Sequence, residues 1–545
     1  MKKRVLYAAL AVFIFSGFLT RDNDIYFEIN KSIEIFGRVY KEVALNYVDD
    51  LNPENFMIAG IEGMLSTLDP YSNFIDISQQ KDIEIITKGK YGGIGATIGV
   101  RNSEVTVVDL IEGFSAQRQG MRIGDVIIKI NDQPIGKDNY DRLGDFLKGD
   151  VGTSLSVTVK RDNSSDPIVF NLVREEIEIK NVPYYGFIPE NSNNAYLKLS
   201  GFSQTAGEEV KRALLNLKAK KEINSLVIDL RGNPGGLLDA AIDVCEKFLQ
   251  KGQLVVTVKG RDSLNVKNHF SLEEPILPET KVVLLIDEGT ASAAEIVAGA
   301  LQDHDRAVIL GTNSFGKGLV QTILPLPYNN SLKLTTARYY TPSGRSIQKI
   351  NYSDKGRIFE TDHSITKREF KTDKKRTVYS AGGIMPDTVV KNISNSELVK
   401  RLLAEGVYFK FATHYYNINP SLDIASISQQ KLLGEFSSYL AKEKFEFVSK
   451  SEKLIEQLKS AAVDEKLDQK FIEQLEKMKA EFDSNHSNEI QKYKDDIYNF
   501  IREELIVRTG GKEKRLRESL MFDKQYDIAC KILENQKLYS KILSK

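Results

Sequence analysis

The order of hydrophobic and polar positions divides the chain into four parts with different periodicities. Apolar residues recur every three or four positions within residues 22–85, which predicts helices. From 91 to 176, short alternating segments separated by glycines predict a small β-rich module. Strand-like apolar runs alternate with helical patterns from 181 to 390, as is typical of an α/β fold. After residue 395 the chain is highly charged, and its pattern predicts mainly helices with solvated faces.

Three strongly predicted strands in the α/β part are each followed by a loop of small residues. SLVIDL (225–230) precedes RGNPGG, KVVLLID (281–287) precedes EGTAS, and AVILG (307–311) precedes NSFGKG. Because the strands of a parallel sheet point the same way, the loops that follow them lie at one edge. We therefore expect Ser292, in the second loop, to lie near Lys317, in the third.

The octet GTNSFGKG has the glycine and lysine spacing of a phosphate-binding P-loop but lacks two of its parts. Gly318 stands where that loop needs a hydroxyl for Mg²⁺. The segment that follows, LVQTILPLPYN, is β-like, so no helix N-terminus would face a phosphate. Nucleotide binding is therefore not expected, and Lys317 needs another role.

Ser292 and Lys317 together have the chemistry of acyl transfer. A serine hydroxyl needs a base to act as a nucleophile near neutral pH, and a buried lysine can be that base because burial favours the uncharged amine. Gln321 follows Lys317 by four residues and is placed to orient it. The backbone N–H of Ala293 and the glycine amides up to Gly236 are candidates for stabilising an oxyanion.

Simpler interpretations of the same residues stay open at this point. A serine at a helix start is commonly an N-cap, a lysine in a glycine loop is commonly solvated, and RGNPGG can be a tight turn. His304 is a rival base, but it lies about 18 Å from Ser292 along one helix at 1.5 Å per residue. The other histidines lie in polar contexts without a motif, so a Ser-His-Asp triad is not expected.

Composition argues against several other classes of function. Lys plus Arg and Asp plus Glu number 75 each, so the basic excess of a general nucleic-acid binder is missing. The two cysteines, Cys245 and Cys530, lie far apart, and the five histidines form no zinc motif. We therefore expect no metal, no other cofactor and no nucleic-acid partner.

The first twenty residues have the pattern of an export signal. Lys2, Lys3 and Arg4 precede an apolar run over 5–19, which is shorter than the roughly 20 residues of a membrane-spanning helix. No clear cleavage site and no lipobox cysteine follow. We expect 1–20 to be a signal peptide or an N-terminal membrane anchor, and the protein to be exported to the periplasm or cell envelope, where that anchor would hold it at the inner membrane.

Ordered motifs make the chain resemble the C-terminal-processing serine peptidases, also called tail-specific proteases. The resemblance covers about residues 25–390 and rests on DPYSNFID (69–76), YGGIGATI (91–98), RGNPGGLL, GTASAAEIVAGALQD, FGKGLVQ, ARYYTPSGRSIQ (337–348) and GGIMPD (382–387). It implies a ClpP/crotonase-like α/β core. It also implies Ser292 as nucleophile, Lys317 as general base, Gln321 as the partner that orients the lysine, and the amides of Gly236 and Ala293 as the oxyanion hole.

The resemblance further identifies the β-rich module as a PDZ domain. The backbone N–H groups of Gly93, Ile94, Gly95 and Ala96 can bind a peptide's terminal carboxylate, and the strand edge can accept the chain by β-augmentation. An ordinary glycine-rich hairpin is the alternative. The segment GFSAQRQGM (113–121) departs from the family's usual Ser-Pro-Ala form, which leaves the ligand preference open.

The predicted organisation is an α/β protease core with an inserted PDZ domain between helical ends. Its parts are the signal or anchor (1–20), an N-terminal helical region (21–85), the PDZ domain (86–178), a Ser-Lys protease core (179–395) and a helical C-terminal extension (396–545). The predicted function is a serine endopeptidase that captures protein C-terminal tails and cleaves at or near them. The extension would bind a second copy or an adaptor. The alternative is an inactive PDZ scaffold of the cell envelope.

Overall fold

The structure is a computed structural model in which the chain forms two units. It describes residues 25–77, 79, 85, 87–101, 103–262, 265–350, 352, 367–391 and 396–544. The first unit comprises residues 1–80, 321–336 and 352–361, and the second comprises the remainder. The predicted signal or anchor segment, 1–20, lies outside the described residues. Among the helices that the structure does describe, we find none with the length and apolarity needed to cross a bilayer.

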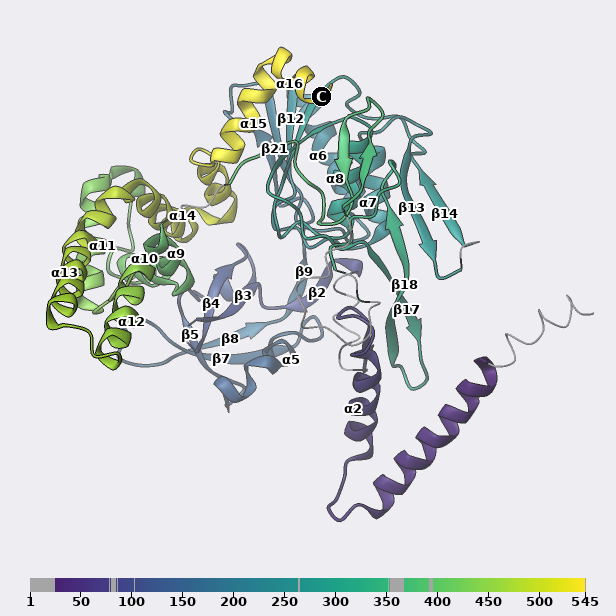
Figure 1. The fold of residues 1–545 in the computed structure, drawn as a ribbon, viewed down its shortest axis with the longest axis horizontal. Helices are drawn as coiled ribbons and strands as arrows, with labels where there is room; N and C mark the ends of the chain where they lie inside the picture. Colours follow the sequence, from purple (N-terminus) through teal and green to yellow (C-terminus); the bar gives the residue numbers. More distant parts are fainter. Residues whose placement is uncertain are drawn as a thin grey trace, which may run out of the picture. The chain divides into compact units, whose positions relative to one another are not determined.

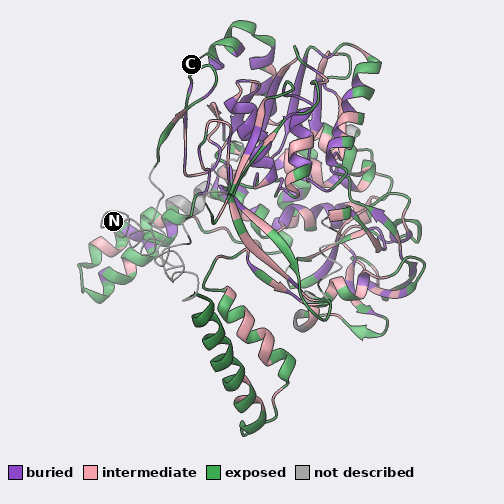
Figure 2. Cartoon of the chain, turned by 90° about the vertical axis from the view of Figure 1, so that its right-hand side faces the viewer, coloured by how far each residue is buried: buried purple, intermediate pink, exposed green. Residues whose placement is uncertain are grey.

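The first unit contains the helices that the N-terminal pattern predicted. A helix over 25–46 is followed by α2 (Pro53–Leu65), which begins where the Asn52 side chain accepts hydrogen bonds from two backbone N–H groups. Both helices are largely exposed (Figure 2). The helical prediction for 22–85 is wrong at β1 (Asn73–Ile75), because these residues pair antiparallel with the start of β18 (Ser331–Tyr340).

The PDZ domain of the second unit is an antiparallel sheet with short helices. The strands are β2 (Lys90–Gly93), β3 (Ala96–Arg101), β4 (Glu104–Leu110), β5 (Val126–Ile130), β6 (Gln133–Pro134), β7 (Ser154–Lys160), β8 (Ile168–Val173) and β9 (Glu175–Glu178). The helices are α4 (Ser115–Arg118), η1 (Lys137–Arg142) and α5 (Leu143–Leu147). The main sheet has the order β3-β4-β5-β7-β8, so β3 is an edge strand. The predicted β-rich module is confirmed.

The protease core is built on a six-stranded sheet (Figure 1). Its order is β10 (Tyr184–Phe187), β11 (Asn194–Lys198), β12 (Ser225–Asp229), β15 (Lys281–Ile286), β16 (Val308–Gly311) and β21 (Thr388–Val389), parallel from β11 onward. Helices α6 (Ala206–Lys220), α7 (Leu238–Glu246) and α8 (Ala293–Asp303) cover one face. The chain between these elements also forms β13 (Leu254–Gly260), β14 (Val266–Phe270), β19 (Glu369–Lys371) and β20 (Thr377–Tyr379). Strand β17 (Leu319–Pro325), which lies mostly in the first unit, pairs with β18. The predicted α/β alternation is therefore confirmed, and β17 follows Lys317 where a P-loop would need a helix.

The opposite face of this sheet is covered by the end of the chain. Helices α15 (Lys524–Glu534) and α16 (Gln536–Ile542), coloured yellow in Figure 1, share a buried apolar cluster with the central strands. The Tyr539 hydroxyl also exchanges hydrogen bonds with the backbone N–H and carbonyl of Val282 on β15, at 3.1 and 3.2 Å. Because both faces are covered, β12 and β15 are almost continuously buried, as is typical of parallel sheets. The predicted extension therefore contributes to the core as well as forming its own domain.

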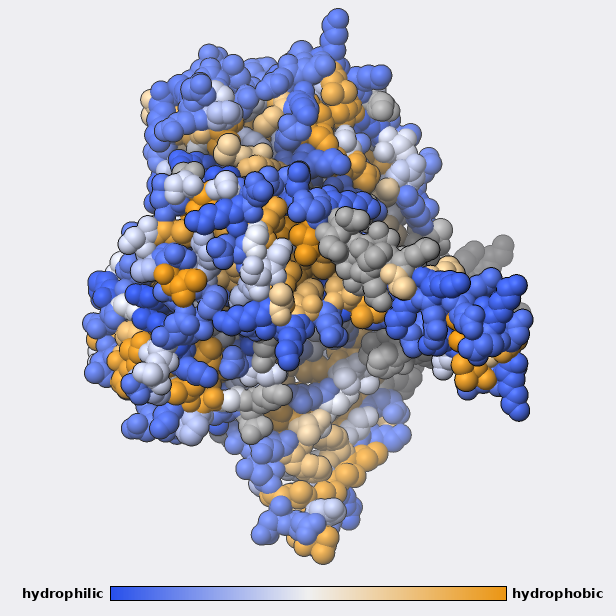
Figure 3. Space-filling model, turned by 90° about the vertical axis from the view of Figure 1, so that its left-hand side faces the viewer, coloured by the Kyte–Doolittle hydropathy of each residue, from blue (hydrophilic) through white to orange (hydrophobic). Residues whose placement is uncertain are grey.

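The helical domain precedes these two helices. It consists of α9 (Glu397–Ala404), α10 (Val407–Ile418), η2 (Ile424–Ser426), α11 (Gln429–Lys442), α12 (Lys450–Asp464), α13 (Gln469–Lys492) and α14 (Lys494–Ser519). An aromatic-rich core, which includes Tyr408, Phe411 and Phe436, holds it together. The surface drawn in Figure 3 is mainly hydrophilic with scattered hydrophobic side chains, in agreement with the prediction of solvated helix faces.

Candidate active site

Ser292 lies on a strained turn directly before α8. Its φ of +54° is unusual for a residue with a side chain, and such strain persists only where the surroundings hold it. The N–H of Ser292 donates to Glu295 Oε2 at 2.8 Å, and the N–H of Glu295 donates back to the Ser292 carbonyl at 2.8 Å. The preceding Ala291 N–H donates to the Asn233 carbonyl at 2.9 Å. The turn is thus tied both to its own helix and to the RGNPGG loop.

Glu295 joins this turn to the loop that carries Lys317. The carboxylate is fully buried, with 0% exposure. Its Oε1 accepts from Ser314 Oγ at 2.5 Å and from the Gly316 N–H at 2.8 Å. Its Oε2 accepts from the N–H of Ser292 at 2.8 Å and from the N–H of Lys317 at 2.9 Å. The backbones of Ser292 and Lys317 therefore meet on a single oxygen atom.

Tyr339, on β18, joins the same two residues a second time. Its buried hydroxyl contacts the carbonyl oxygens of both Ser292, at 3.2 Å, and Lys317. Two independent side chains therefore hold the Ser292 turn against the Lys317 loop. This bears out the prediction that the loops after β15 and β16 converge at one edge of the sheet.

The RGNPGG loop reaches the same point through Gly235. This residue has φ of +95°, and a Cβ added to it would lie 2.6 Å from the Ala291 carbonyl oxygen and 2.8 Å from the Ala293 nitrogen. Gly236 instead lies against Phe202, whose carbonyl oxygen would be 2.3 Å from an added Cβ. Within the described part of the chain, the N–H groups of Gly236 and Ala293 take part in no backbone hydrogen bond. The two N–H groups predicted to form the oxyanion hole therefore donate no hydrogen bond to another backbone group.

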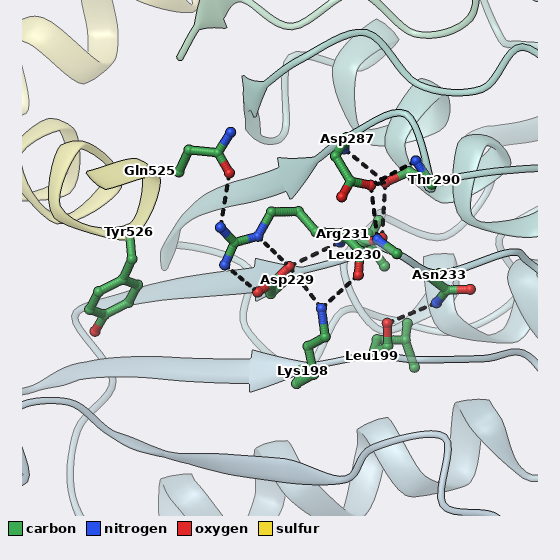
Figure 4. A network of polar contacts seen from close by, with 12 residues as sticks. Lys198, Leu199, Asp229, Leu230, Arg231, Asn233, Asp287, Thr290, Gln525 and Tyr526 are labelled. Carbon is green, nitrogen blue, oxygen red and sulfur yellow. Dashed lines mark hydrogen bonds and ion pairs between the residues drawn. The ribbon is translucent and has the colours of Figure 1, made fainter. Parts of the chain in front are cut away.

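The start of this loop is fixed by a charged network around Asp229 (Figure 4). Asp229, at the end of β12, accepts from the Tyr196 hydroxyl at 2.7 Å, from Lys198 Nζ at 3.1 Å, and from Arg231 Nε and Nη2 at 2.9 and 2.6 Å. Burial acts to raise the pKa of Asp229, but the Arg231 and Lys198 cations outweigh it and hold the pKa well below its usual range. Lys198 Nζ also donates to the Arg231 carbonyl at 2.7 Å.

The middle of the loop is bonded to both neighbouring strand ends. The Gly232 N–H donates to Asp287 Oδ1 at 2.8 Å, and Asn233 Nδ2 donates to the Leu199 carbonyl at 2.8 Å. Figure 4 shows these contacts together with Thr290 Oγ1, which donates to the Leu230 carbonyl at 2.9 Å. The loop that would supply an oxyanion amide is therefore held along most of its length.

Gln321 and His304 both bond residues outside the loops described above. Gln321, on β17, donates through Nε2 to Thr335 Oγ1 at 3.2 Å within the first unit, so its role in orienting Lys317 stays a prediction. His304 follows the last turn of α8, where Nδ1 bonds Asp373 at 2.8 Å and Nε2 bonds the Leu254 carbonyl at 2.7 Å. Both ring nitrogens therefore have partners other than Ser292.

The buried position of Glu295 predicts a pH-dependent stability. Burial raises the pKa of this carboxyl from 4.5 to about 7, while its four hydrogen-bond donors act in the opposite direction. From pH 4.5 to 7 the folded protein keeps a proton that the unfolded chain has lost, so this group's stabilisation falls as pH rises and levels off above 7. We expect the free energy of unfolding, measured with urea at a series of pH values, to fall between pH 4.5 and 7. The fall should be smaller in Glu295→Gln. The same pH dependence of the unfolding free energy in both proteins would contradict a raised pKa for Glu295.

The PDZ domain offers a groove of about 400 Å³ between the edge strand β3 and α5. Its lining is mainly apolar and includes Ile94, Ala96, Ile98, Tyr140, Leu143 and Leu147. Of the four residues predicted to bind a peptide, Gly93, Ile94 and Ala96 line the groove. Gly95 does not line it, and a Cβ added there would be 2.2 Å from Phe114 Cβ. The free edge of β3 and the groove lie together, as β-augmentation requires.

Comparison with known proteins finds matches for three parts of the chain and two curated relatives. Family models match at residues 193–354 ("Peptidase family S41"), 106–161 ("PDZ domain") and 398–533 ("Probable PDZ-protease, C-terminal helical domain"). The carboxy-terminal-processing protease of Bartonella bacilliformis is 39% identical over 323 residues, which are 59% of this chain and 73% of that one. The carboxy-terminal processing protease CtpB of Bacillus subtilis is 30% identical over 387 residues, 70% of this chain and 76% of that one. A solved photosystem II D1 C-terminal processing protease is 24% identical, with a TM-score of 0.36, and the match covers 65% of this chain and 92% of that one.

An α/β core matched by a serine peptidase family model, a PDZ domain and a C-terminal helical domain together define a class of serine peptidase. The chain belongs to peptidase family S41. The predicted fold, a ClpP/crotonase-like core with a PDZ domain, N-terminal helices and a C-terminal helical domain, is confirmed. The prediction of a serine peptidase is likewise confirmed. The roles given to individual residues stay predictions.

Sequence reasoning missed Glu295 and the network around Asp229. The spacing Ser-Ala-Ala-Glu from Ser292 to Glu295 is that of a helix capping box, and this was a visible signal for the buried carboxylate. Asp229 and Asp287 were visible only as strand-terminal acids, which are common. Nothing in the local pattern linked Asp229 to the end of the chain.

Proposed function

We propose that this peptidase cleaves proteins at or near their C-terminal tails, with Ser292 as nucleophile and Lys317 as general base. The observation that carries the proposal is the Glu295 carboxylate, which binds the backbones of both residues on one oxygen. The Gly235 contact beside Ser292 and Ala293 supports the same assignment, because it brings the glycine loop to the place where an oxyanion would form.

The proposed reaction is an acyl transfer in two steps. The uncharged Lys317 amine takes the hydroxyl proton as Ser292 Oγ attacks the peptide carbonyl, and the N–H groups of Gly236 and Ala293 stabilise the resulting oxyanion. The lysine then gives its proton to the departing amine, which leaves an acyl-enzyme. In the second step Lys317 deprotonates a water that attacks the ester and then returns the proton to Ser292 Oγ. Gln321 is the proposed partner that orients the amine.

The PDZ groove is the proposed site for the substrate's C-terminal tail. An extended tail added to the edge of β3 would place its last side chain in the apolar groove and its carboxylate near Gly93 and Ile94. The charged and apolar pattern of residues 1–20 supports an envelope location for this activity, so exported proteins are the proposed substrates.

The proposal is tested by incubating an unfolded protein with the wild type and with Ser292→Ala and mapping new C-termini by mass spectrometry. We expect cleavage by the wild type alone, starting from the C-terminal side, and slower cleavage when the substrate's terminal carboxylate is amidated. Equal cleavage by both proteins would show that Ser292 is not the nucleophile. No cleavage by either protein would favour the alternative of an inactive PDZ scaffold.

Filling the PDZ groove should weaken capture of protein substrates. Gly144 lines the groove, and an added Cβ would meet only the end of the Lys148 side chain, at 3.8 Å, so Gly144→Leu should fit the fold and occupy the groove. We expect KM for a tail-bearing protein to rise about tenfold, roughly 1.4 kcal/mol of binding, while cleavage of a short internal peptide is unchanged. Gly136→Leu is the control, because an added Cβ there meets nothing within 4 Å. An unchanged KM for Gly144→Leu would place tail binding elsewhere.

A further inference from the structure

The Arg231 side chain connects the end of β12, at the edge of the sheet where the Ser292 and Lys317 loops meet, to the first turn of α15. Its Nε and Nη2 bond Asp229, whereas its Nη1 bonds Asp523 Oδ2 at 2.6 Å and Gln525 Oε1 at 2.9 Å. Figure 4 shows the Gln525 side chain reaching Arg231 from α15. The guanidinium is therefore shared between the end of β12 and a segment almost 300 residues later in the chain.

The start of α15 is itself firmly held. Gln525 is buried, and its Nε2 donates to the Val390 carbonyl at 2.6 Å, directly after β21. The Asp523 side chain caps α15 by accepting from the N–H groups of Gln525 and Tyr526 at 2.9 and 3.1 Å. The Tyr526 hydroxyl donates to the Ile188 carbonyl at 2.9 Å. A side chain that bonds this turn is thus fixed relative to the central sheet.

Arg231 is also the first residue of the loop that leads to Gly235 and Gly236. The Arg231 carbonyl accepts from Lys198, the next residue donates to Asp287, and Gly235 contacts the residues on either side of Ser292. Displacing the guanidinium would therefore move the start of a loop whose end supplies a proposed oxyanion amide. Shifts of about 1 Å in such a group are large enough to slow catalysis.

We propose that Asp523 is a positioning residue of the peptidase, which acts on the RGNPGG loop through Arg231. This inference rests on the proposed function, because it requires that the Gly236 amide stabilise the oxyanion. It makes the C-terminal segment part of the catalytic apparatus, in addition to its packing on the sheet. A purely structural role would affect stability and leave the turnover of folded molecules unchanged.

The structure offers two substitutions that separate these roles. Asp523→Asn keeps a side-chain oxygen that can cap α15 and removes the negative charge opposite Arg231. Gln525→Glu keeps an acceptor for Arg231 but replaces the donor to the Val390 carbonyl with a carboxylate. Asp527→Asn is the matched control, because Asp527 is exposed on the same helix and pairs with Lys531.

The experiment measures kcat, KM and thermal unfolding of each variant, with kcat divided by the fraction of molecules that react with an irreversible serine-directed reagent. For Asp523→Asn we expect kcat to fall between about 10-fold and 100-fold, with KM within twofold of the wild type. For Gln525→Glu we expect near-normal kcat with a lowered unfolding temperature. Asp527→Asn should match the wild type in both.

Asp523→Asn with the wild-type kcat per reactive molecule would overturn the inference, whether or not its unfolding temperature falls. A loss of kcat in Gln525→Glu as large as that in Asp523→Asn would overturn it too, since the Arg231 contact is kept there. Ser292→Ala is measured alongside. If it cleaves as fast as the wild type, the proposed function has failed. If it is inactive while Asp523→Asn is normal, only the positioning role has failed.

Discussion

Ser292→Ala and Lys317→Ala should each lower kcat for peptide cleavage by at least about 10⁴-fold, with little change in unfolding temperature. Both side chains are proposed to act in one proton transfer, so the double variant should be no slower than either single variant. Neither substitution removes the Glu295 and Tyr339 contacts that hold the site, because these are made to backbone atoms of residues 292 and 317. Steady-state kinetics on a fluorogenic peptide, together with thermal unfolding, measures both quantities.

Lys317→Arg is the informative control for the base. A guanidinium stays protonated at accessible pH, so this variant should be as inactive as Lys317→Ala. The wild-type rate should rise with pH as the lysine loses its proton. Substantial activity in Lys317→Arg would mean that residue 317 acts as a cation, and full activity in Lys317→Ala would end the proposed mechanism.

Glu295→Gln should lower kcat by about 10²- to 10³-fold while KM changes little. The two carboxylate oxygens accept four hydrogen bonds, and an amide nitrogen in place of either oxygen would face donors that it cannot pair with. Each lost bond at this buried site costs about 1–3 kcal/mol, and the Ser292 turn and the Lys317 loop would separate to relieve it. The same kinetic assay and an unfolding curve measure the effect.

Glu288→Gln is the matched control for that substitution, because Glu288 is an exposed acid in the loop before Ser292. It should match the wild type in kcat, KM and stability. Wild-type kcat in Glu295→Gln would show that the shared oxygen is dispensable for the geometry of the site.

The convergence of Ser292 and Lys317 could be predicted because it follows from topology. Apolar runs before each loop identified the strands, and parallel strands bring the loops after them to one edge. The contacts of Glu295 and Tyr339 that hold the two loops together could not be predicted from the sequence. A glutamate three residues after a serine indicates a capping box, but the other three partners of Glu295 lie in the next loop of the sheet.

Long-range packing accounts for what the sequence did not predict. The amphipathic pattern of α15 indicates a buried face but not which surface covers it, and that surface is the central sheet. Strand β1 has three residues and follows a helical region, so its pairing with β18 left no periodic signal. The local sequence predicts Asp523 only as the N-cap of α15. Its contact with Arg231 joins residues far apart in the chain, so the local sequence does not indicate it.

Covalent capture tests the central claim most directly. The wild type, Lys317→Ala and Ser292→Ala are incubated with a peptide phosphonate, and the modified residue is located by mass spectrometry. The account predicts one adduct on Ser292 in the wild type, far slower formation in Lys317→Ala and none in Ser292→Ala. An adduct on another residue, or equal labelling in all three proteins, would contradict it.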